Sequence, residues 1–195
     1  MGFPRFLLAS AAVCVVAVAF AQSVPVPNSA PAANASVQIP AAPAPTGASS
    51  WLVMDYTNGQ VLASSNPDVR MEPASITKVM TSYVVAAEIK AGKIKATDQV
   101  MISENAWRGG GGGTDGSTSF LPLNSSVSLD ELERGMVIQS GNDAAIALAE
   151  HVAGSEQAFV ELMNNYAKKI GMTNSHFANP HGLSDPNHYS TARDL

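Results

Sequence analysis

Pro-Ala-Ser-Ile-Thr-Lys, residues 73–78, opens the helix on which the predicted fold and chemistry depend. Apolar residues follow at the spacing of one helix face, and Gly92 is the expected end of the helix. We predict that this face is buried; its members are Ile76, Val79, Met80, Tyr83, Val84 and Ala87. Because a helical turn takes about 3.6 residues, Ser75 and Lys78 lie one turn apart on the same side, with Ser75 at the N-terminal end.

The pairing of Ser75 with Lys78 predicts nucleophilic chemistry. Burial removes water from an ammonium group and lowers its pKa, so a neutral amine at Lys78 can take the proton of the Ser75 hydroxyl. A helix N-terminus also favours negative charge that develops nearby. We therefore predict Ser75 as nucleophile and Lys78 as base in acyl transfer. The alternative is a chance pairing, because serine and lysine are common residues and a single Ser-x-x-Lys pattern is weak evidence.

A second motif, Ser140-Gly141-Asn142, precedes an alanine-rich stretch. In acyl-transfer enzymes with Ser-x-x-Lys, a second motif of this kind supplies a hydroxyl that relays a proton and an amide that holds the substrate backbone. We predict Ser140 as a catalytic residue and Asn142 as a substrate-binding residue. The alternative is a plain helix N-cap at residues 140–143.

The order of secondary-structure signals predicts an α+β fold. Residues 51–56 and 60–63 alternate as strands around Asn58-Gly59, a pair that supplies the positive φ angles of a tight hairpin turn. Helices are expected after Ser128, which starts a capping box, and over residues 144–152 and 159–170, with a further helix opening at Ser190-Thr191. Strands followed by helices indicate an antiparallel sheet with a helical cluster, C-terminally truncated at Leu195.

The N-terminal segments predict export. Arg5, an apolar run to Phe20 and Ala19-Phe20-Ala21 form a signal peptide over residues 1–21, and Cys14 leaves with it. A membrane anchor is the alternative, but the run is shorter than the roughly 20 residues that a bilayer requires. Residues 22–48 form a Pro/Ala-rich linker, and residues 49–195 form the N-terminal part of the catalytic domain.

Composition narrows the class of protein. The chain has 195 residues, a net charge of -5 and 46% hydrophobic residues, and its basic residues are scattered, which argues against a nucleic-acid partner. The four histidines show no metal-binding spacing, so we expect no metal and no other cofactor, and we interpret them as surface or hydrogen-bonding residues.

Several linked motifs resemble those of the low-molecular-mass penicillin-binding proteins, which are serine-type D-alanyl-D-alanine carboxypeptidases. The resemblance covers nearly everything after residue 50. It is carried by Asp55, residues 57–59, 70–81, 116–117, 120–121, 139–144, 171–177 and 181–183, and Ser190-Thr191-Ala192-Arg193-Asp194-Leu195. The order and number of these motifs make the resemblance highly specific.

The resemblance implies a β-lactamase/transpeptidase-like fold and an acyl-enzyme formed on Ser75, with Lys78 as proton acceptor and Ser140 and Asn142 completing the relay and the substrate contacts. It implies a peptidoglycan peptide ending in D-Ala-D-Ala as substrate and β-lactams as covalent inhibitors. The place of action would be the periplasm or cell envelope, in cell-wall biosynthesis and cell-shape control. A C-terminal amphipathic anchor would associate the full-length protein with the membrane surface.

Two departures from the family pattern and two rivals accompany this interpretation. The family loop after Gly116 usually ends in Gly, where this chain has Asn124, a residue that tolerates the left-handed conformation. The third family motif, Lys-Thr-Gly, does not occur in these residues, so we expect the chain alone to be inactive.

One rival interpretation is a secreted serine β-lactamase, although Gly141 and the helical setting of Glu161 do not match its commonest class. The other is an inactive truncated fragment that binds penicillin or peptidoglycan.

Overall fold

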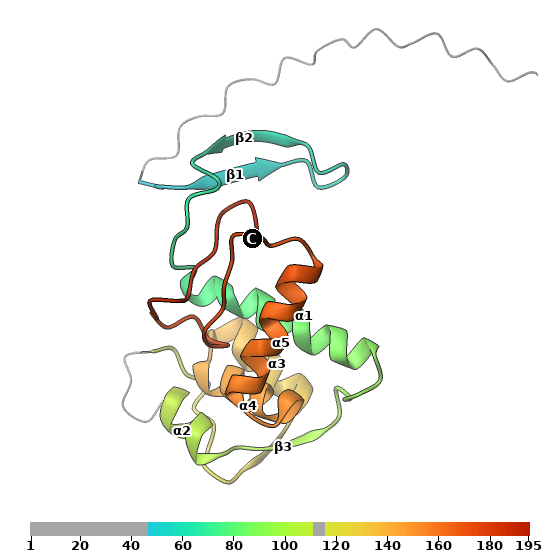
Figure 1. Cartoon of the computed structure of the whole chain (residues 1–195). Coiled ribbons are helices and arrows are strands. Elements are labelled where there is room, and N and C mark those ends of the chain that lie inside the picture. Colours follow the sequence, from blue (N-terminus) through green and yellow to red (C-terminus); the bar gives the residue numbers. More distant parts are fainter. Residues whose placement is uncertain (1–46, 111–115) are drawn as a thin grey trace, which may run out of the picture. The chain divides into compact units, whose positions relative to one another are not determined.

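The computed structural model describes residues 47–110 and 116–195. The predicted signal peptide, residues 1–21, and the predicted linker up to residue 46 lie outside the described residues. In chain order the elements are β1 (Trp51–Met54), β2 (Val61–Ser65), the 3-10 turn η1 (Ala74–Ile76), α1 (Thr77–Lys90), β3 (Gln99–Met101), α2 (Glu104–Gly110), β4 (Ser126–Ser128), α3 (Leu129–Gln139), α4 (Asn142–Ala153) and α5 (Glu156–Lys169) (Figure 1). Two small antiparallel ladders with a cluster of helices make the described part α+β.

The predicted hairpin forms, but its turn differs from the prediction. β1 pairs antiparallel with β2, with Val53 opposite Ala63 and a register shift at Met54. The connection is a four-residue loop, because the Asp55 N–H bonds to the Gln60 carbonyl at 2.8 Å and only Gly59 has a positive φ, at 74°. The Asp55 carboxylate accepts the N–H and hydroxyl of Thr57 and so curls the loop before Asn58 is reached.

The helix predicted at residues 73–92 is present, but the prediction of its buried face is partly wrong. Ile76, Val79 and Tyr83 are 55%, 65% and 43% exposed. The buried side of α1 instead combines apolar with polar residues, namely Thr77, Lys78, Met80, Thr81, Val84, Val85 and Glu88. Polar groups can be buried there because they find partners, such as the Pro180 carbonyl for the Thr81 hydroxyl at 2.6 Å. Gly92 ends the helix with φ 74°, as predicted.

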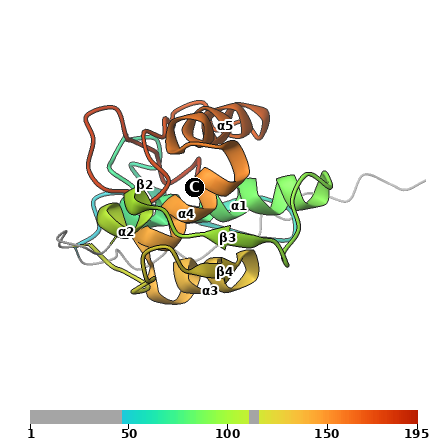
Figure 2. The same ribbon diagram turned by 90° about the horizontal axis from the view of Figure 1, so that it is seen from below.

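The remaining predicted helices form around α4. The capping box at Ser128 is present at the start of α3, and α5 begins at Glu156, three residues before the predicted Phe159. α4 packs against α1, α2, α3 and α5, and Figure 2 shows α5 and α3 on opposite sides of it. Its buried residues include four alanines, whose small side chains let the surrounding helices approach closely. α4 is therefore the centre of the helical cluster.

Three short elements were not predicted. β3 pairs with β4 over three residues each, with Val100 opposite Val127, and α2 runs into Gly109 and Gly110. Strands this short carry no periodic signal, and glycine disfavours a helix. α2 contacts α4 so closely that a side chain at Gly110 would collide with the Asp143 backbone. Tertiary contact therefore overrides local propensity in α2.

The end of the chain also differs from the prediction. Ser190 does not open a helix but forms a β-bridge with Met71. One turn follows, in which the Thr191 hydroxyl caps the N–H of Asp194 at 3.1 Å and the Leu195 N–H bonds to the Thr191 carbonyl at 3.1 Å. The expected left-handed conformation of Asn124 is present, with φ 60°.

Candidate active site

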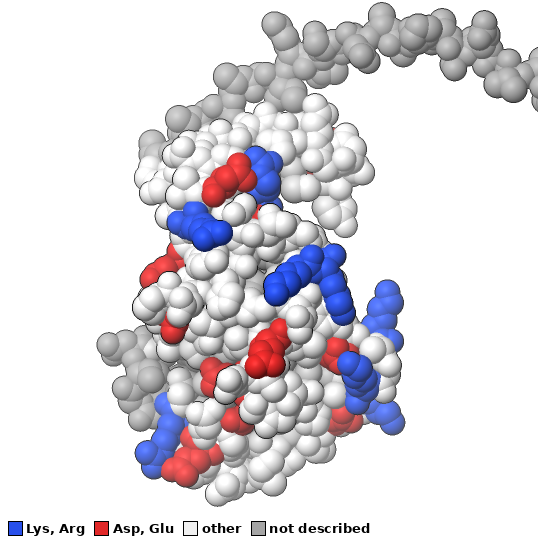
Figure 3. Space-filling view, in the orientation of Figure 1, with Lys and Arg blue, Asp and Glu red and all other residues white. Residues whose placement is uncertain are grey.

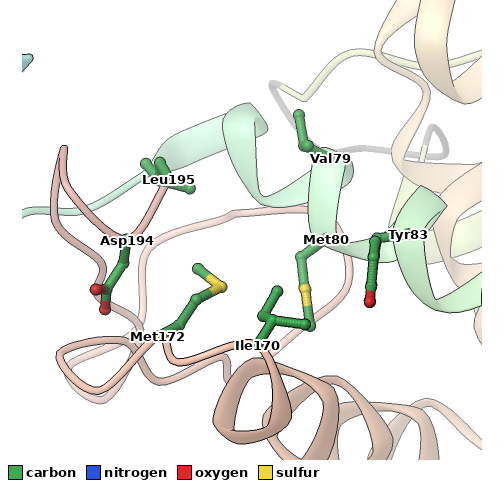
Figure 4. A pocket seen from close by; sticks show the side chains of 7 residues that line it. All are labelled: Val79, Met80, Tyr83, Ile170, Met172, Asp194 and Leu195. Atoms are coloured by element: carbon green, nitrogen blue, oxygen red, sulfur yellow. The ribbon is translucent and has the colours of Figure 1, made fainter. Parts of the chain in front are cut away.

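Two hollows lie along the partly exposed side of α1. One, of about 100 Å³, is lined by Val79, Met80, Tyr83, Ile170, Met172, Asp194 and Leu195 (Figure 4). Its single carboxylate, Asp194, is already bound to the Asn174 N–H and the Ser175 hydroxyl. The other hollow, of about 480 Å³, lies between α1 and α3 and contains Ser75, Lys78 and Ser140. Only the larger hollow brings chemically reactive groups together.

Ser75 stands at a strained turn. It belongs to η1, directly before α1, and its side chain is exposed to solvent. The preceding residue, Ala74, has φ 47°, a left-handed conformation that a residue with a Cβ adopts only at a cost. The turn presents the Ser75 hydroxyl at the surface, while Lys78 one turn later is only 5% exposed.

The Lys78 amine lies within hydrogen-bond distance of four oxygens. The Asn142 side-chain oxygen is 2.8 Å from Nζ and the His181 carbonyl oxygen is 2.9 Å away. The hydroxyl oxygens of Ser75 and Ser140 lie farther off, at 3.2 Å and 3.3 Å. The structure therefore brings all four predicted site residues to one amine.

These partners divide into two kinds. The Asn142 and His181 oxygens can only accept hydrogen bonds, whereas hydroxyls can both donate and accept. In the neutral amine, two N–H bonds to the two acceptors leave the nitrogen lone pair for the hydroxyls of Ser75 and Ser140. The geometry thus suits proton transfer from a serine to Lys78.

The surroundings make the neutral amine accessible near physiological pH. Burial lowers the pKa of Lys78 from 10.5 to about 8, against the opposing effect of the negative charge of Asp143. Asp143 is itself buried, and its carboxylate accepts the N–H groups of Ser119 and Leu121 and the hydroxyl of Thr118. The same carboxylate therefore tunes the amine and ties down the 117–121 loop.

The alternative interpretation of residues 140–143 as a helix N-cap is correct for Gly141 but not for Ser140. Ser140 is the C-cap of α3 with φ 58°, and Gly141 occupies the N-cap of α4 without a side-chain cap bond. Freed from capping, the Ser140 hydroxyl points to Lys78. Asn142 is 3% exposed, and because ammonium groups only donate, its oxygen rather than its nitrogen faces Lys78.

Sequence reasoning missed the contribution of residues 178–190, which we call the crossing segment. It supplies the His181 carbonyl to Lys78, and its Gly182 packs so closely on the Ala74 carbonyl that a side chain there would collide. A backbone carbonyl that binds an amine can belong to any residue type, so the sequence does not reveal it. The only sequence signal near this carbonyl is the family motif His181-Gly182-Leu183. The crossing segment and α4 together fix the amine.

The described histidines serve as hydrogen-bonding groups. His151 contacts Asp98, His176 contacts the Asn187 carbonyl, and His181 and His188 are buried with partners of their own. Over residues 47–110 and 116–195, no group of three or more His, Cys, Asp or Glu side chains could hold a metal ion.

Neither the described helices nor the charged face in Figure 3 indicates a membrane-spanning helix or a single basic patch. Among the helices that the structure describes, none is both long and apolar enough to span a bilayer. On the face seen in Figure 3, lysines and arginines lie among carboxylates and do not gather into one patch.

A buried amine shared by two serine hydroxyls, set between helices of an α+β fold, defines a protein of the serine acyl-transfer class. The family model for D-alanyl-D-alanine carboxypeptidases matches residues 36–195, and the chain belongs to this family of serine peptidases. The sequence resemblance is thereby confirmed.

Individual relatives support the same family assignment. D-alanyl-D-alanine carboxypeptidase DacC of Escherichia coli K12 is 50% identical over 167 residues, which are 85% of this chain and 42% of DacC. The solved structure of penicillin-binding protein 5 from Haemophilus influenzae is 50% identical and superposes with a TM-score of 0.74 over 78% of this chain and 44% of that one. A Streptomyces K15 DD-transpeptidase, 29% identical, superposes with a TM-score of 0.70 over 75% of this chain and 57% of that one.

These comparisons have two consequences. The predicted β-lactamase/transpeptidase-like fold is confirmed by the superpositions. The chain spans about two fifths of the length of the curated relatives it matches, 42% of DacC and 37% of the DacA of Haemophilus influenzae.

Proposed function

We propose that the protein is a serine-type D-Ala-D-Ala carboxypeptidase that removes the terminal D-alanine from peptidoglycan pentapeptides through an acyl-enzyme on Ser75. The observation that carries the proposal is the buried Lys78 amine, 3.2 Å from the Ser75 hydroxyl and 3.3 Å from the Ser140 hydroxyl. The substrate class comes from the relatives, which are named as D-alanyl-D-alanine carboxypeptidases.

The first half-reaction forms the acyl-enzyme. The Ser75 oxygen attacks the carbonyl carbon between the two D-alanines while its proton passes to Nζ of neutral Lys78. The tetrahedral intermediate collapses when the leaving nitrogen receives a proton, which the Lys78 ammonium delivers through the Ser140 hydroxyl. The C–N bond breaks, D-alanine departs, and the shortened peptide remains as an ester on Ser75.

The second half-reaction releases the peptide. Water attacks the ester carbon, loses a proton to Lys78, and the Ser75 oxygen takes the proton back as the C–O bond breaks. The negative charge on the carbonyl oxygen develops next to the N-terminal end of η1 and α1, where the helix dipole and the Ser75 N–H favour it. The amide nitrogen of Asn142, whose oxygen is held by Lys78, donates to the substrate backbone.

The partners and location follow from this chemistry. Penicillins present a strained amide to the same serine, so β-lactams are covalent inhibitors of the protein. The signal peptide at residues 1–21 exports the chain. The linker at 22–48 separates the signal-peptide cleavage site from the domain that begins at residue 49, and this domain acts in the periplasm or cell envelope. The full-length protein associates with the membrane surface.

The β-lactamase rival receives no support from a specific observation. Glu161, the acid that a β-lactamase interpretation would need near the nucleophile, lies exposed on α5. Curated relatives at 40–51% identity carry the name D-alanyl-D-alanine carboxypeptidase, namely DacA, DacC, DacD and DacF.

D-alanine release tests the proposal directly. Because residues 1–195 lack Lys-Thr-Gly and are expected to be inactive alone, this assay and those below use the protein extended through that motif. The extended protein is incubated with diacetyl-Lys-D-Ala-D-Ala and, in parallel, with benzylpenicillin, and free D-alanine and opened β-lactam are quantified. We expect D-alanine release that needs Ser75 and is blocked by prior exposure to penicillin. Rapid, repeated opening of penicillin without D-alanine release would instead favour the β-lactamase, and neither reaction in a folded protein would favour the inactive binding fragment.

A further inference from the structure

A buried histidine contacts the catalytic turn from the crossing segment. His188 is 2% exposed and Thr77 is fully buried, and the His188 Nε2 atom lies 2.7 Å from the Thr77 hydroxyl oxygen. Thr77 lies between Ser75 and Lys78 in the chain. The imidazole also stands edge-on to the Phe177 ring, with ring centroids 5.8 Å apart.

The second ring nitrogen settles which atom carries the proton. The Ala178 N–H points at His188 Nδ1 from 3.0 Å, and a backbone N–H can only donate, so Nδ1 must be the unprotonated acceptor. Nε2 therefore carries the hydrogen and donates it to the Thr77 hydroxyl. The neutral imidazole thus links the crossing segment to the first turn of α1 with a defined direction.

The turn that His188 reaches needs external support. Ala74 has φ 47°, and a residue in this conformation stays there only when its surroundings hold it. Three contacts from the crossing segment provide that support: Gly182 against the Ala74 carbonyl, the His181 carbonyl on Lys78, and the Pro180 carbonyl on Thr81. Of the side-chain contacts that the crossing segment makes with this turn, the His188 bond is the one from a titratable group.

We propose that His188 is a positioning residue for the reaction. By donating a hydrogen bond to Thr77, it keeps the Ser75 hydroxyl and the Lys78 amine at the distance that proton transfer requires. The inference rests on the proposed function, because the rate it controls is acylation of Ser75. His188 touches neither substrate nor reacting atoms. A simple core-filling role would give the ring the same burial but would assign no importance to the hydrogen on Nε2.

Acylation by a fluorescent penicillin tests the proposal when melting temperature is recorded for the same variants. His188→Ala should slow acylation by about 10²-fold, the effect typical of a catalytic group displaced by about 1 Å. His188→Gln should come within a few-fold of wild type, because an amide can donate to Thr77 and accept from Ala178. Thr77→Val, which keeps volume but removes the acceptor, should lose at least about tenfold, and Thr77→Ser should not.

Stability is separated from positioning by a matched control. Val100→Ala removes buried volume in β3, away from the site, and should lower the melting temperature while leaving the acylation rate near wild type. If His188→Ala does not fold, the acylation rates of Thr77→Val and of the Val100→Ala control still decide the test.

Opposite results refute different claims. Suppose that penicillin labels the wild type. The positioning role is then wrong if the acylation rate of His188→Gln falls as far as that of Thr77→Val. It is also wrong if neither Thr77→Val nor His188→Ala slows acylation. A folded wild type that no penicillin labels overturns the proposed function and the positioning role with it.

The pH dependence of stability tests whether the folded chain requires the neutral form of His188. A second proton on Nδ1 would set an N–H against the Ala178 N–H, and burial lowers the pKa of His188 from its ordinary value of 6.5. Electrostatic interaction with His181 and His176 lowers this pKa further, while Asp185 and Glu72 oppose the shift.

The sign follows from proton linkage. The unfolded chain binds the proton first as pH falls below about 6.5, so this contribution to stability is full above that pH and is lost toward the lowered pKa. The melting temperature of wild type should fall more steeply from pH 7 to pH 5 than that of His188→Gln. Parallel curves would show that His188 does not need its neutral form and would overturn the proposal.

Discussion

Replacing Lys78 by arginine removes the neutral amine while keeping the positive charge. With a pKa of about 8, roughly one Lys78 amine in ten is neutral at pH 7 and roughly half are neutral at pH 8. An arginine pKa above about 12 leaves fewer than about one side chain in 10⁵ neutral at pH 7. Because a general base contributes about 10²–10⁴-fold, we expect Lys78→Arg to slow acylation by at least about 10²-fold.

The same argument predicts a pH profile. Only the neutral amine accepts the serine proton, so wild-type acylation should rise about tenfold from pH 6 to pH 7 and level off above the pKa of about 8. Lys78→Arg should show a low, flat rate over this range. The rise is lost as pH falls, because protonation of Lys78 removes the base.

The assay is the rate of covalent labelling by a fluorescent penicillin between pH 6 and pH 9. Lys93→Arg is the matched control: it makes the same substitution at a side chain that is 64% exposed and paired with Glu88, and it should leave rate and profile unchanged. A wild-type rate in Lys78→Arg, or a wild-type profile that is flat across this range, would refute the role of Lys78 as base.

Three further predictions have defined outcomes. Ser140→Ala should slow D-alanine release by at least about tenfold and leave the melting temperature nearly unchanged, because the hydroxyl relays a proton and caps no helix; a wild-type release rate would remove Ser140 from the relay. Gly182→Ala should lower both the melting temperature and the labelling rate, because a methyl group there collides with the Ala74 carbonyl and φ is 92°; unchanged values for both would show that the close contact does not constrain the turn. The exported protein should begin at Gln22, which intact-mass measurement decides, and a retained Met1 would rule out the signal peptide.

Helix ends were the most predictable part of the fold. The Ser128 capping box and Gly92 act through bonds and backbone angles within a few residues, so their signals are local. The hairpin was predicted for the same reason. Its turn was predicted wrongly because the Asp55 carboxylate, not the Asn-Gly pair, determines the path of the loop.

Features that depend on distant segments were not predictable. The apolar pattern of α1 fits more than one face, and the choice is made by the crossing segment, which gives Thr77 and Thr81 polar partners about 100 residues away in the chain. α2 forms although it ends in glycines, because it packs on α4. Each of these choices required tertiary contacts.

The candidate site divides in the same way. The Ser-x-x-Lys spacing predicts that Ser75 and Lys78 meet, because both lie on one helical turn. The second motif predicted that Ser140 and Asn142 belong to the site, but only the structure shows that the Asn142 oxygen binds the amine. Sequence reasoning did not identify the His181 carbonyl or the His188 bond as parts of the site, because neither is a catalytic side chain in a recognisable motif.

Locating the covalent adduct tests the central claim most directly. The protein is treated with benzylpenicillin, digested and analysed by tandem mass spectrometry, with Ser75→Ala as the control. We predict one penicilloyl group on the Ser75 oxygen, and Ser75→Ala that folds like wild type but carries none. An adduct on another residue, or one that persists in Ser75→Ala, would contradict the account.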